Sequence, residues 1–322
     1  MLVSDTPGFS DEPVSILVVV VLYRMRPSES PALRSIVASA KGSNQKDLRF
    51  KALLYDNTPN GQEPGILPES VEYWAARTNR GISSAYNFSL EMAETEGFDW
   101  LVTLDQDTTV PASYCERIVG LARELAAHFE IAGLVPKIWD RGIFISPHVS
   151  VRGRSCRLPQ NFAGVSNGEI TAINSGTIWR ARSLREIGGF HSLFWLDYLD
   201  HWLFHVIQQA GKLIYVVGDL DLEHELSLLK TDHQLSPDRL ADILAAESAF
   251  YDLYKSPSEG WMLTADMFSR ILKQFLKGKR SLWPVTWGCL QQRLLCARAK
   301  RVALWEQKSR LRLENSSQVD RF

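Results

Sequence analysis

Apolar runs alternate with amphipathic segments along the first half of the chain. The run from Val14 to Tyr23 (VSILVVVVLY) is continuous and β-branched, as expected of a strand buried on both faces. Shorter apolar runs predict strands at residues 50–55, 71–75 and 98–104, and helical spacing predicts helices at residues 31–40, 82–94 and 111–128. Strands that alternate with helices in this way indicate an α/β fold built on a parallel sheet.

The last third of the chain follows a different pattern. A strand is predicted from Lys212 to Val217, followed by an acidic loop that contains His224. Beyond the loop the apolar spacing becomes helical, which predicts helices at residues 240–254, 261–276 and 289–313. We therefore expect a sheet-containing domain over residues 1–236 and a helical extension over residues 237–322.

Composition narrows the class of protein. With 322 residues and 45% hydrophobic content, the chain can bury a large core. Four cysteines without CxxC spacing predict buried thiols in a reducing cytoplasm rather than a disulfide or zinc framework. The N-terminus is acidic and turn-rich, so no secretory signal is expected. The apolar run at residues 16–22 is too short to span a membrane.

The charge is unevenly distributed. The whole chain carries a net charge of −1, which gives no general attraction to nucleic acid. Residues 270–312 contain twelve Lys or Arg and one acidic residue, Glu306, so this segment carries +11 and the remainder −12. The same segment contains Trp283, Trp287 and Trp305. Two interpretations remain open: peripheral docking on anionic lipid of the inner leaflet, or a basic face that packs against the acidic body.

Polar residues follow the predicted strands at Tyr23-Arg24, Asp56-Asn57 and Asp105-Gln106-Asp107. Ligands of open α/β sheets bind outside the carboxyl ends of the strands. Asp105 and Asp107 are two residues apart in an extended segment, so their carboxylates share a face and repel each other. A Mg²⁺ or Mn²⁺ ion would relieve that repulsion, since both ions prefer carboxylate and phosphate oxygens. A solvated turn is the alternative for such a DxD sequence.

Six segments in this order resemble a known family: VVVVLY, LLYDNT, NRGISSAYN, LDQDTTVP, INSGTIWRARSLREIGGF and FWLDYLDHW. The set resembles the inverting, metal-dependent nucleotide-sugar glycosyltransferases of family 2, and among them the bacterial rhamnosyltransferase branch. The resemblance covers roughly residues 14–226. It implies the A-type (GT-A) fold, a Rossmann-like, mostly parallel sheet flanked by helices. It also implies a divalent metal cofactor, a dTDP-rhamnose or UDP-sugar donor, and a glycan or lipid-linked saccharide acceptor at the inner face of the plasma membrane.

The resemblance assigns the donor side to residues at the strand ends. It implies that Asp56 contacts the base or ribose and that Asn79 and Gly81 belong to the loop that covers the nucleoside. Tyr23 and Gln106 are assigned to donor binding with them. Each has a structural alternative, since Asp56 suits a turn before Asn-Thr-Pro and Asn79 suits a helix cap.

The resemblance likewise implies a metal–diphosphate site at Asp105 and Asp107, with Asp107 as the direct ligand. His224 is a further candidate ligand, and a surface histidine is its alternative. Ser175, in the segment from Ile173 to Thr177, matches the acceptor-side strand and is assigned to the bound donor, although a plain Ser-Gly turn would explain it equally well.

The catalytic candidates lie in FWLDYLDHWLFHVIQQAG. Asp197 and Asp200 are three residues apart, and Asp200 opens an apolar helix that ends near Gly211. The resemblance implies that Asp200 is the general base, with Asp197 as the second candidate. A carboxylate at a helix start is also a common cap. Trp202 stands where relatives usually carry a second acidic residue, which leaves the support of the base in doubt.

Two other functions fit parts of this sequence. A nucleotidyltransferase would be expected to have a Gly-rich basic loop after the first strand, and LYRMRPSES contains no glycine. A non-catalytic sugar-nucleotide or membrane-surface binding protein of the same fold is the second alternative, and Trp202 is the feature that favours it. No nucleic-acid partner is expected, because no recognised binding motif accompanies the basic segment.

Overall fold

The structure is a computed structural model of the chain and describes residues 12–151, 154–166, 168–224 and 235–318. The N-terminal stretch for which we expect no secretory signal lies, over residues 1–11, outside the described residues.

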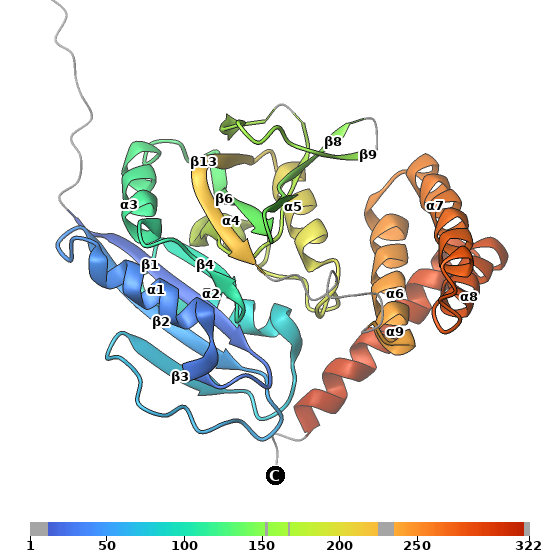
Figure 1. Ribbon diagram of the computed structural model, residues 1–322, viewed down its shortest axis with the longest axis horizontal. Coiled ribbons are helices and arrows are strands. Elements are labelled where there is room, and N and C mark those ends of the chain that lie inside the picture. The colour runs from blue at the N-terminus through green and yellow to red at the C-terminus, as the bar shows by residue number, and fades with distance from the viewer. Residues whose placement is uncertain (1–11, 152–153, 167, 225–234, 319–322) are drawn as a thin grey trace, which may run out of the picture.

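A ten-stranded sheet forms the centre of the molecule (Figure 1). Its strands are β1 (Val14–Leu22), β2 (Leu48–Asp56), β3 (Val71–Ala75), β4 (Trp100–Asp105), β5 (Thr108–Thr109), β6 (Ile131–Asp140), β7 (Ile143–Ser146), β10 (Gly164–Val165), β12 (Thr177–Arg180) and β13 (Leu213–His224). The order is β10-β13-β6-β12-β4-β1-β2-β3, with β5 paired to β13 and β7 to β6. Strands β3, β2, β1, β4, β6 and β13 run in one direction, while β12 and β10 oppose them. The sheet is therefore mostly parallel, as predicted.

Helices cover both faces of this sheet (Figure 1). They are η1 (Pro27–Glu29), α1 (Pro31–Gly42), α2 (Gly81–Glu96), α3 (Tyr114–Glu124), α4 (Ala181–Glu186) and α5 (Leu199–Gln209). The side chains of β1 alternate between the two layers, because successive residues of a strand point to opposite faces. Leu17 and Val19 pack with α2, α4 and α5, whereas Val18 and Val20 pack with α1 and α3. A small second sheet contains β8 (His148–Val151), β9 (Arg154–Arg157) and β11 (Ile170–Thr171).

The helical extension consists of α6 (Pro237–Tyr254), α7 (Pro257–Leu276), α8 (Trp283–Leu295) and α9 (Arg298–Gln318). Leu244, Met267 and Leu290 belong to a core shared by α6, α7 and α8. Helix α9 runs from this bundle back towards the main body (Figure 1), where the buried Trp305 packs 4.8 Å from the Phe194 ring. The boundary expected at residues 236 and 237 coincides with the start of α6, but the division into two domains stays a prediction.

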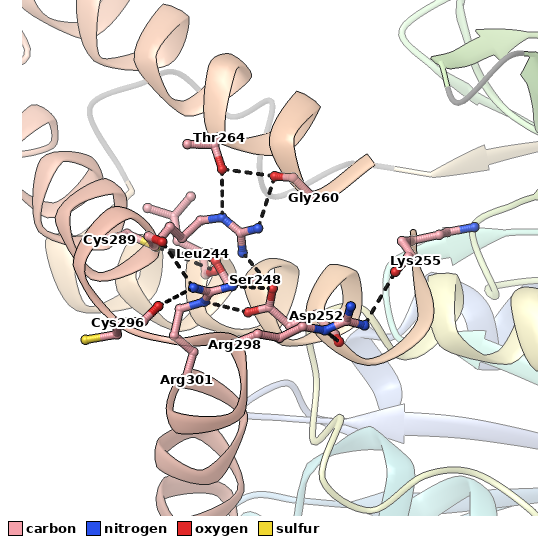
Figure 2. A network of polar contacts seen from close by, with 11 residues as sticks. Leu244, Ser248, Asp252, Lys255, Gly260, Thr264, Cys289, Cys296, Arg298 and Arg301 are labelled. Atoms are coloured by element: carbon pink, nitrogen blue, oxygen red, sulfur yellow. Dashed lines mark hydrogen bonds and ion pairs between the residues drawn. The ribbon is translucent and has the colours of Figure 1, made fainter. Parts of the chain in front are cut away.

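A buried acid joins the helices of the extension. The carboxylate of Asp252 on α6 receives Arg301 of α9 at 2.7 Å and lies 3.5 Å from Arg293 of α8. Figure 2 shows the Arg301 guanidinium beside the acid, with Arg298 turned towards the backbone at the end of α6.

Three expectations from the sequence are wrong. The single helix expected at 289–313 is divided at Cys296, and the break allows Arg293 and Arg301 to approach Asp252 from two helices. The expected acidic loop is the continuation of β13, because Leu220, Leu222 and His224 alternate as buried residues with exposed acids. The expectation of buried thiols holds for Cys115 but not for Cys156, which is exposed.

Candidate active site

The acidic end of β4 meets the end of β13. Strand β5 pairs with β13, which places Thr108 opposite His224. The His224 Nε2 atom lies 3.8 Å from Asp105 Oδ2, and its Nδ1 atom lies 3.7 Å from Asp107 Oδ1. The structure therefore brings together the three residues predicted as metal ligands.

The hydroxyl groups of Thr108 and Ser175 fix the positions of His224 and Asp105 by hydrogen bonds. Thr108 Oγ1 lies 2.7 Å from His224 Nδ1 and 2.6 Å from Ser175 Oγ, and Ser175 Oγ accepts a hydrogen bond from the Asp105 backbone N–H at 2.9 Å. Ser175 is buried. The hydroxyl braces Asp105 and Thr108, and its role towards the donor stays a prediction. Residues 174–176 form a turn that leads into β12.

The donor set fits a divalent cation. Burial raises the pKa of Asp105, His224 lowers it, and the neighbouring Asp107 raises it again. A cation at this point would relieve the repulsion between the Asp105 and Asp107 carboxylates. Thr108 contacts Nδ1 of His224, which leaves Nε2 facing Asp105. Within the described residues no group of three or more His, Cys, Asp and Glu forms a ready-made metal site.

A cleft of about 650 Å³ opens beside these residues. Asp107, His224, Gln106 and Arg141 line part of it. A larger cavity of about 820 Å³ lies between α1 and residues 62–68, and it contains none of the predicted site residues. Of these two cavities, the smaller one is the candidate site, because it is lined by the predicted metal ligands Asp107 and His224.

The predicted donor contact Asp56 is buried at the end of β2. Its Oδ1 accepts a hydrogen bond from the Thr58 N–H at 2.8 Å, and its Oδ2 accepts from the Tyr73 hydroxyl at 2.7 Å and from Gln62 Nε2 at 3.1 Å. With 0% of Asp56 exposed, the carboxylate shapes the loop after β2, and its role towards a base or ribose stays a prediction.

Asn79 and Gly81 form the entry of α2. Asn79 Oδ1 accepts from the Gly81 N–H at 3.1 Å, which is an Asx turn rather than a helix cap, because Arg80 is the N-cap residue of α2. Gly81 has φ +77°, and a Cβ atom there would lie 2.4 Å from the carbonyl oxygen of Trp195. The Ile82 N–H donates to that same oxygen at 3.0 Å. The glycine thus allows the predicted nucleoside loop to lie directly against the loop that leads to Asp200.

Tyr23 and Gln106 connect β1 with β4. The Tyr23 backbone N–H donates to Gln106 Oε1 at 2.8 Å, and the Ser30 hydroxyl donates to the Gln106 carbonyl oxygen at 2.8 Å. The Tyr23 side chain is exposed. Tyr23 is therefore available to a ligand, whereas the Gln106 amide oxygen already has a partner.

The candidate base Asp200 lies in the first turn of α5. Its Oδ2 atom accepts a hydrogen bond from the Asn174 backbone N–H at 3.3 Å. The pKa of Asp200 is raised to about 7, chiefly by burial and then by the charge of Asp105; the Asn174 hydrogen bond lowers it, and Asp197 contributes a smaller rise. A carboxylate with a pKa near 7 is suited to accept a proton at neutral pH.

The second candidate, Asp197, occupies a different environment. Both of its oxygens are held by the guanidinium of Arg239 in the first turn of α6, one of them by Nη2 at 2.6 Å. Such a bidentate pair fixes the carboxylate and stabilises its charged form. Among the described residues no guanidinium pairs with Asp200, so the geometry favours Asp200 as the base.

Tyr198 connects Asp200 with the helical extension. It precedes α5 in the left-handed conformation, with φ +62°, which is uncommon for a residue other than glycine. Its hydroxyl donates to Glu247 of α6 at 2.7 Å, and Glu247 receives both guanidinium nitrogens of Arg270 from α7 at 2.6 and 2.7 Å. This series of contacts fixes the backbone two residues before the base.

Trp202 points away from the charged cluster. It is buried, and its ring lies 5.3 Å from that of His191 in an edge-to-face arrangement. The residue two positions after Asp200 therefore contributes to the apolar core on α5 rather than to the support of the base.

Comparison with known families identifies the fold. The profile described as glycosyl transferase family 2 matches residues 18–186, slightly more than half of the 322 residues. The chain belongs to this family. The A-type glycosyltransferase fold that the resemblance implied is confirmed by the family and by the architecture of the sheet.

One solved structure is similar to this chain at the level of the fold. The chain is similar to GalNAc-T7 crystallised with UDP, GalNAc and Mn²⁺, with a TM-score of 0.53 and 16% identity, over 76% of this chain and 49% of that one. It therefore spans about half the length of the GalNAc-T7 chain. It also matches Staphylococcus aureus TarS 1–349 with a TM-score of 0.48 and 14% identity, over 96% of this chain and 92% of that one. No curated protein sequence matches.

Sequence reasoning missed several residues of this family site. Thr108, Asn174, Arg239 and Glu247 were not singled out, although each contacts a predicted site residue. Glu247 carried a detectable signal, since it is an acid within the otherwise apolar segment LAAESAF. Arg239 carried none, because nothing in the sequence near it distinguishes it from a solvated arginine.

Proposed function

We propose that this protein is an inverting nucleotide-sugar glycosyltransferase in which Asp200 is the general base. The observation that carries the proposal is the position of the Asp200 carboxylate. It is bonded to the Asn174 amide, its pKa is raised to about 7, and Asp105 is close enough to contribute to that rise. A proton acceptor next to a metal–diphosphate site is what transfer from a nucleotide sugar requires.

In the proposed reaction, the acceptor hydroxyl attacks the anomeric carbon from the face opposite the diphosphate. Asp200 takes the hydroxyl proton as the new glycosidic bond forms and the bond to the diphosphate breaks. Asp105, Asp107 and His224 are the residues that would hold Mg²⁺ or Mn²⁺, and the bound ion would neutralise charge on the leaving diphosphate. Asn174 orients the base through its backbone N–H.

The substrates belong to the same proposal. The rhamnosyltransferase-like motifs favour dTDP-β-L-rhamnose as the donor, with a UDP-sugar as the alternative, and a glycan or lipid-linked saccharide as the acceptor. We place the enzyme in the cytoplasm, attached peripherally to the inner face of the plasma membrane. Among the described residues, no helix combines the length and apolarity needed to cross a bilayer.

The test combines donor screening with one substitution. Nucleotide sugars with Mn²⁺ should raise the melting temperature when they bind, because a ligand of the folded state stabilises it. With the best donor, Asp200→Asn should lower kcat by about 10²-fold or more and leave donor affinity little changed.

Asp219→Asn is the matched control, since Asp219 is an exposed aspartate on β13 that pairs with Arg117. If donor affinity collapses in Asp200→Asn while kcat survives, Asp200 has a structural role in the first turn of α5 and Asp197 becomes the candidate base. If no nucleotide sugar is bound with metal or turned over by the wild-type chain, the non-catalytic alternative replaces the enzyme.

A further inference from the structure

Helix α7 presents an apolar stripe to solvent. The stripe consists of Trp261, Ala265, Phe268, Leu272, Phe275 and Leu276. Their spacing of three, four and seven residues places them on one side of the helix. The five large members are between 58% and 74% exposed.

The opposite side of α7 already has partners. Leu263 and Met267 are buried in the core shared with α6 and α8. The helix is therefore apolar on two sides, and among the described residues one of these sides packs in the core of the extension. A contiguous exposed apolar surface on a folded protein usually marks an interaction site.

Cations gather at the C-terminal end of the stripe. Residues 273–280 (KQFLKGKR) contain Lys273, Lys277, Lys279 and Arg280 and no acidic residue. Lys273, Lys277 and Arg280 are exposed. Phe275 contacts Trp283 of α8 at a ring distance of 6.2 Å, which adds a half-buried tryptophan at this end.

Most other cations of the basic segment are used inside the chain. Arg293 and Arg301 approach Asp252 (Figure 2), Lys308 and Arg312 bind Asp242, and Arg270 binds Glu247. For these residues the packing interpretation of the basic tail describes the observed contacts. The cluster at 273–280 joins positive charge to the exposed apolar side chains of the stripe.

We propose that the α7 stripe and the cations of residues 273–280 dock the protein on an anionic lipid surface. The apolar side chains enter the boundary between headgroups and acyl chains, and the cations bind lipid phosphates. This inference deepens the peripheral attachment in the proposed function, on which it rests, and assigns it to α7 instead of the whole tail from Trp261 to Leu313.

Charge complementarity selects lipid over a second copy of this chain. A second copy that packed its own α7 on the stripe would cover it, but it would bring the same cations against each other. An anionic bilayer supplies both an apolar layer and negative charge, with a contribution of about 1 kcal/mol per Lys or Arg near the surface. Helix α9 is excluded from the docking face at Trp305, which is 8% exposed and belongs to the protein core.

The experiment is co-sedimentation of the full chain with vesicles. One set contains phosphatidylcholine alone, and the other contains equal parts of phosphatidylcholine and phosphatidylglycerol, at about 50 mM and about 500 mM salt. We expect binding to the anionic vesicles that weakens at high salt. Combined Lys273→Ala, Lys277→Ala and Arg280→Ala should weaken it about 10²-fold. Phe275→Ser with Leu276→Ser should weaken it at least about tenfold.

The matched control is Leu304→Ser with Leu311→Ser, which removes two exposed apolar side chains from α9 and should leave binding unchanged. Donor turnover measured without vesicles tests the proposed function separately, and the α7 variants should retain it. The inference is overturned if the full chain ignores anionic vesicles, or if the α7 and α9 variants bind equally. It is also overturned if the α7 variants convert a dimer into a monomer without reducing vesicle binding.

Discussion

The carboxyl edge of the sheet and the helical extension both withdraw acidic side chains partly or fully from solvent, but the two regions differ in how these acids are paired. At the sheet edge, Asp105 and Asp200 lie close enough that the charge of Asp105 raises the pKa of Asp200. In the extension, Asp252 has Arg293 and Arg301, and Glu247 has Arg270. The first region keeps like charges together, and the second balances each acid with guanidinium groups.

This difference distinguishes the residues expected to take part in the reaction from those that hold the helices of the extension together. Like charges in a partly desolvated site cost stability and persist where a substrate or cation will use them. A balanced buried pair contributes little net stability, but the loss of one partner leaves an uncompensated charge. Substitutions at the sheet edge should therefore change activity more than stability, and substitutions in the extension should do the reverse.

The largest effect is expected at Asp107. Asp107→Ala should reduce metal-dependent transfer by about 10³-fold or more, a loss of at least about 4 kcal/mol in transition-state stabilisation. The melting temperature should change little, since the Asp107 side chain is 28% exposed and lies at a cleft. Steady-state transfer with Mn²⁺ and with EDTA measures the effect, and Asp219→Ala is the control. Full activity of Asp107→Ala in EDTA would remove Asp107 from the metal site.

The reverse outcome is expected at Asp252. Asp252→Ala should lower the free energy of unfolding by about 3–4 kcal/mol, because Arg293 and Arg301 lose their buried partner. Chemical denaturation measures this loss, and kcat per folded molecule should remain near that of the wild type.

Asp242→Ala is the control for Asp252→Ala. Asp242 also binds two cations, Lys308 and Arg312, but its side chain is more exposed. Its loss should cost no more than about 1 kcal/mol. Equal losses in the two variants would contradict the distinction between a buried network and a surface pair.

The sequence could predict the local features of the site better than the contacts between residues that are far apart in the chain. Strand β1 and the aspartates after β4 are local features, since a continuous apolar run and a DxD sequence can be read without knowledge of distant residues. Thr108 and His224 are 116 residues apart and meet through strand pairing, while Arg239 and Asp197 are 42 apart and meet through helix packing. No local pattern encodes such partners. The β13 error was avoidable, because the alternation in LDLEH is typical of a half-buried strand.

Glu247 lies between the two regions and should show a mixed effect. Glu247→Gln keeps an acceptor for Tyr198 but weakens the bond to Arg270, so the backbone before Asp200 becomes less fixed. We expect kcat to fall about tenfold with the donor KM unchanged, since positioning of the base affects the transition state rather than donor binding. Asp252→Asn is the control in the same helix. A parallel loss of kcat in both variants would assign the effect to general loosening of the bundle.

The smallest effect is expected for the pH dependence of stability, which measures how much ionised Asp200 destabilises the folded state. Asp200 has a pKa of about 7 in the folded chain and an ordinary value of 3.8, so the folded state holds its proton more tightly. Stability therefore falls as pH rises through that window, and the folded state bears the full cost once Asp200 is ionised above pH 7. Asp200→Asn removes the cost. In EDTA, its melting temperature should exceed that of the wild type by a few degrees at about pH 8, with a smaller difference at about pH 5. The same difference at both pH values, or a larger one at pH 5, would show that burial does not raise the proton affinity of Asp200. The raised pKa that suits Asp200 to act as a general base would then be absent.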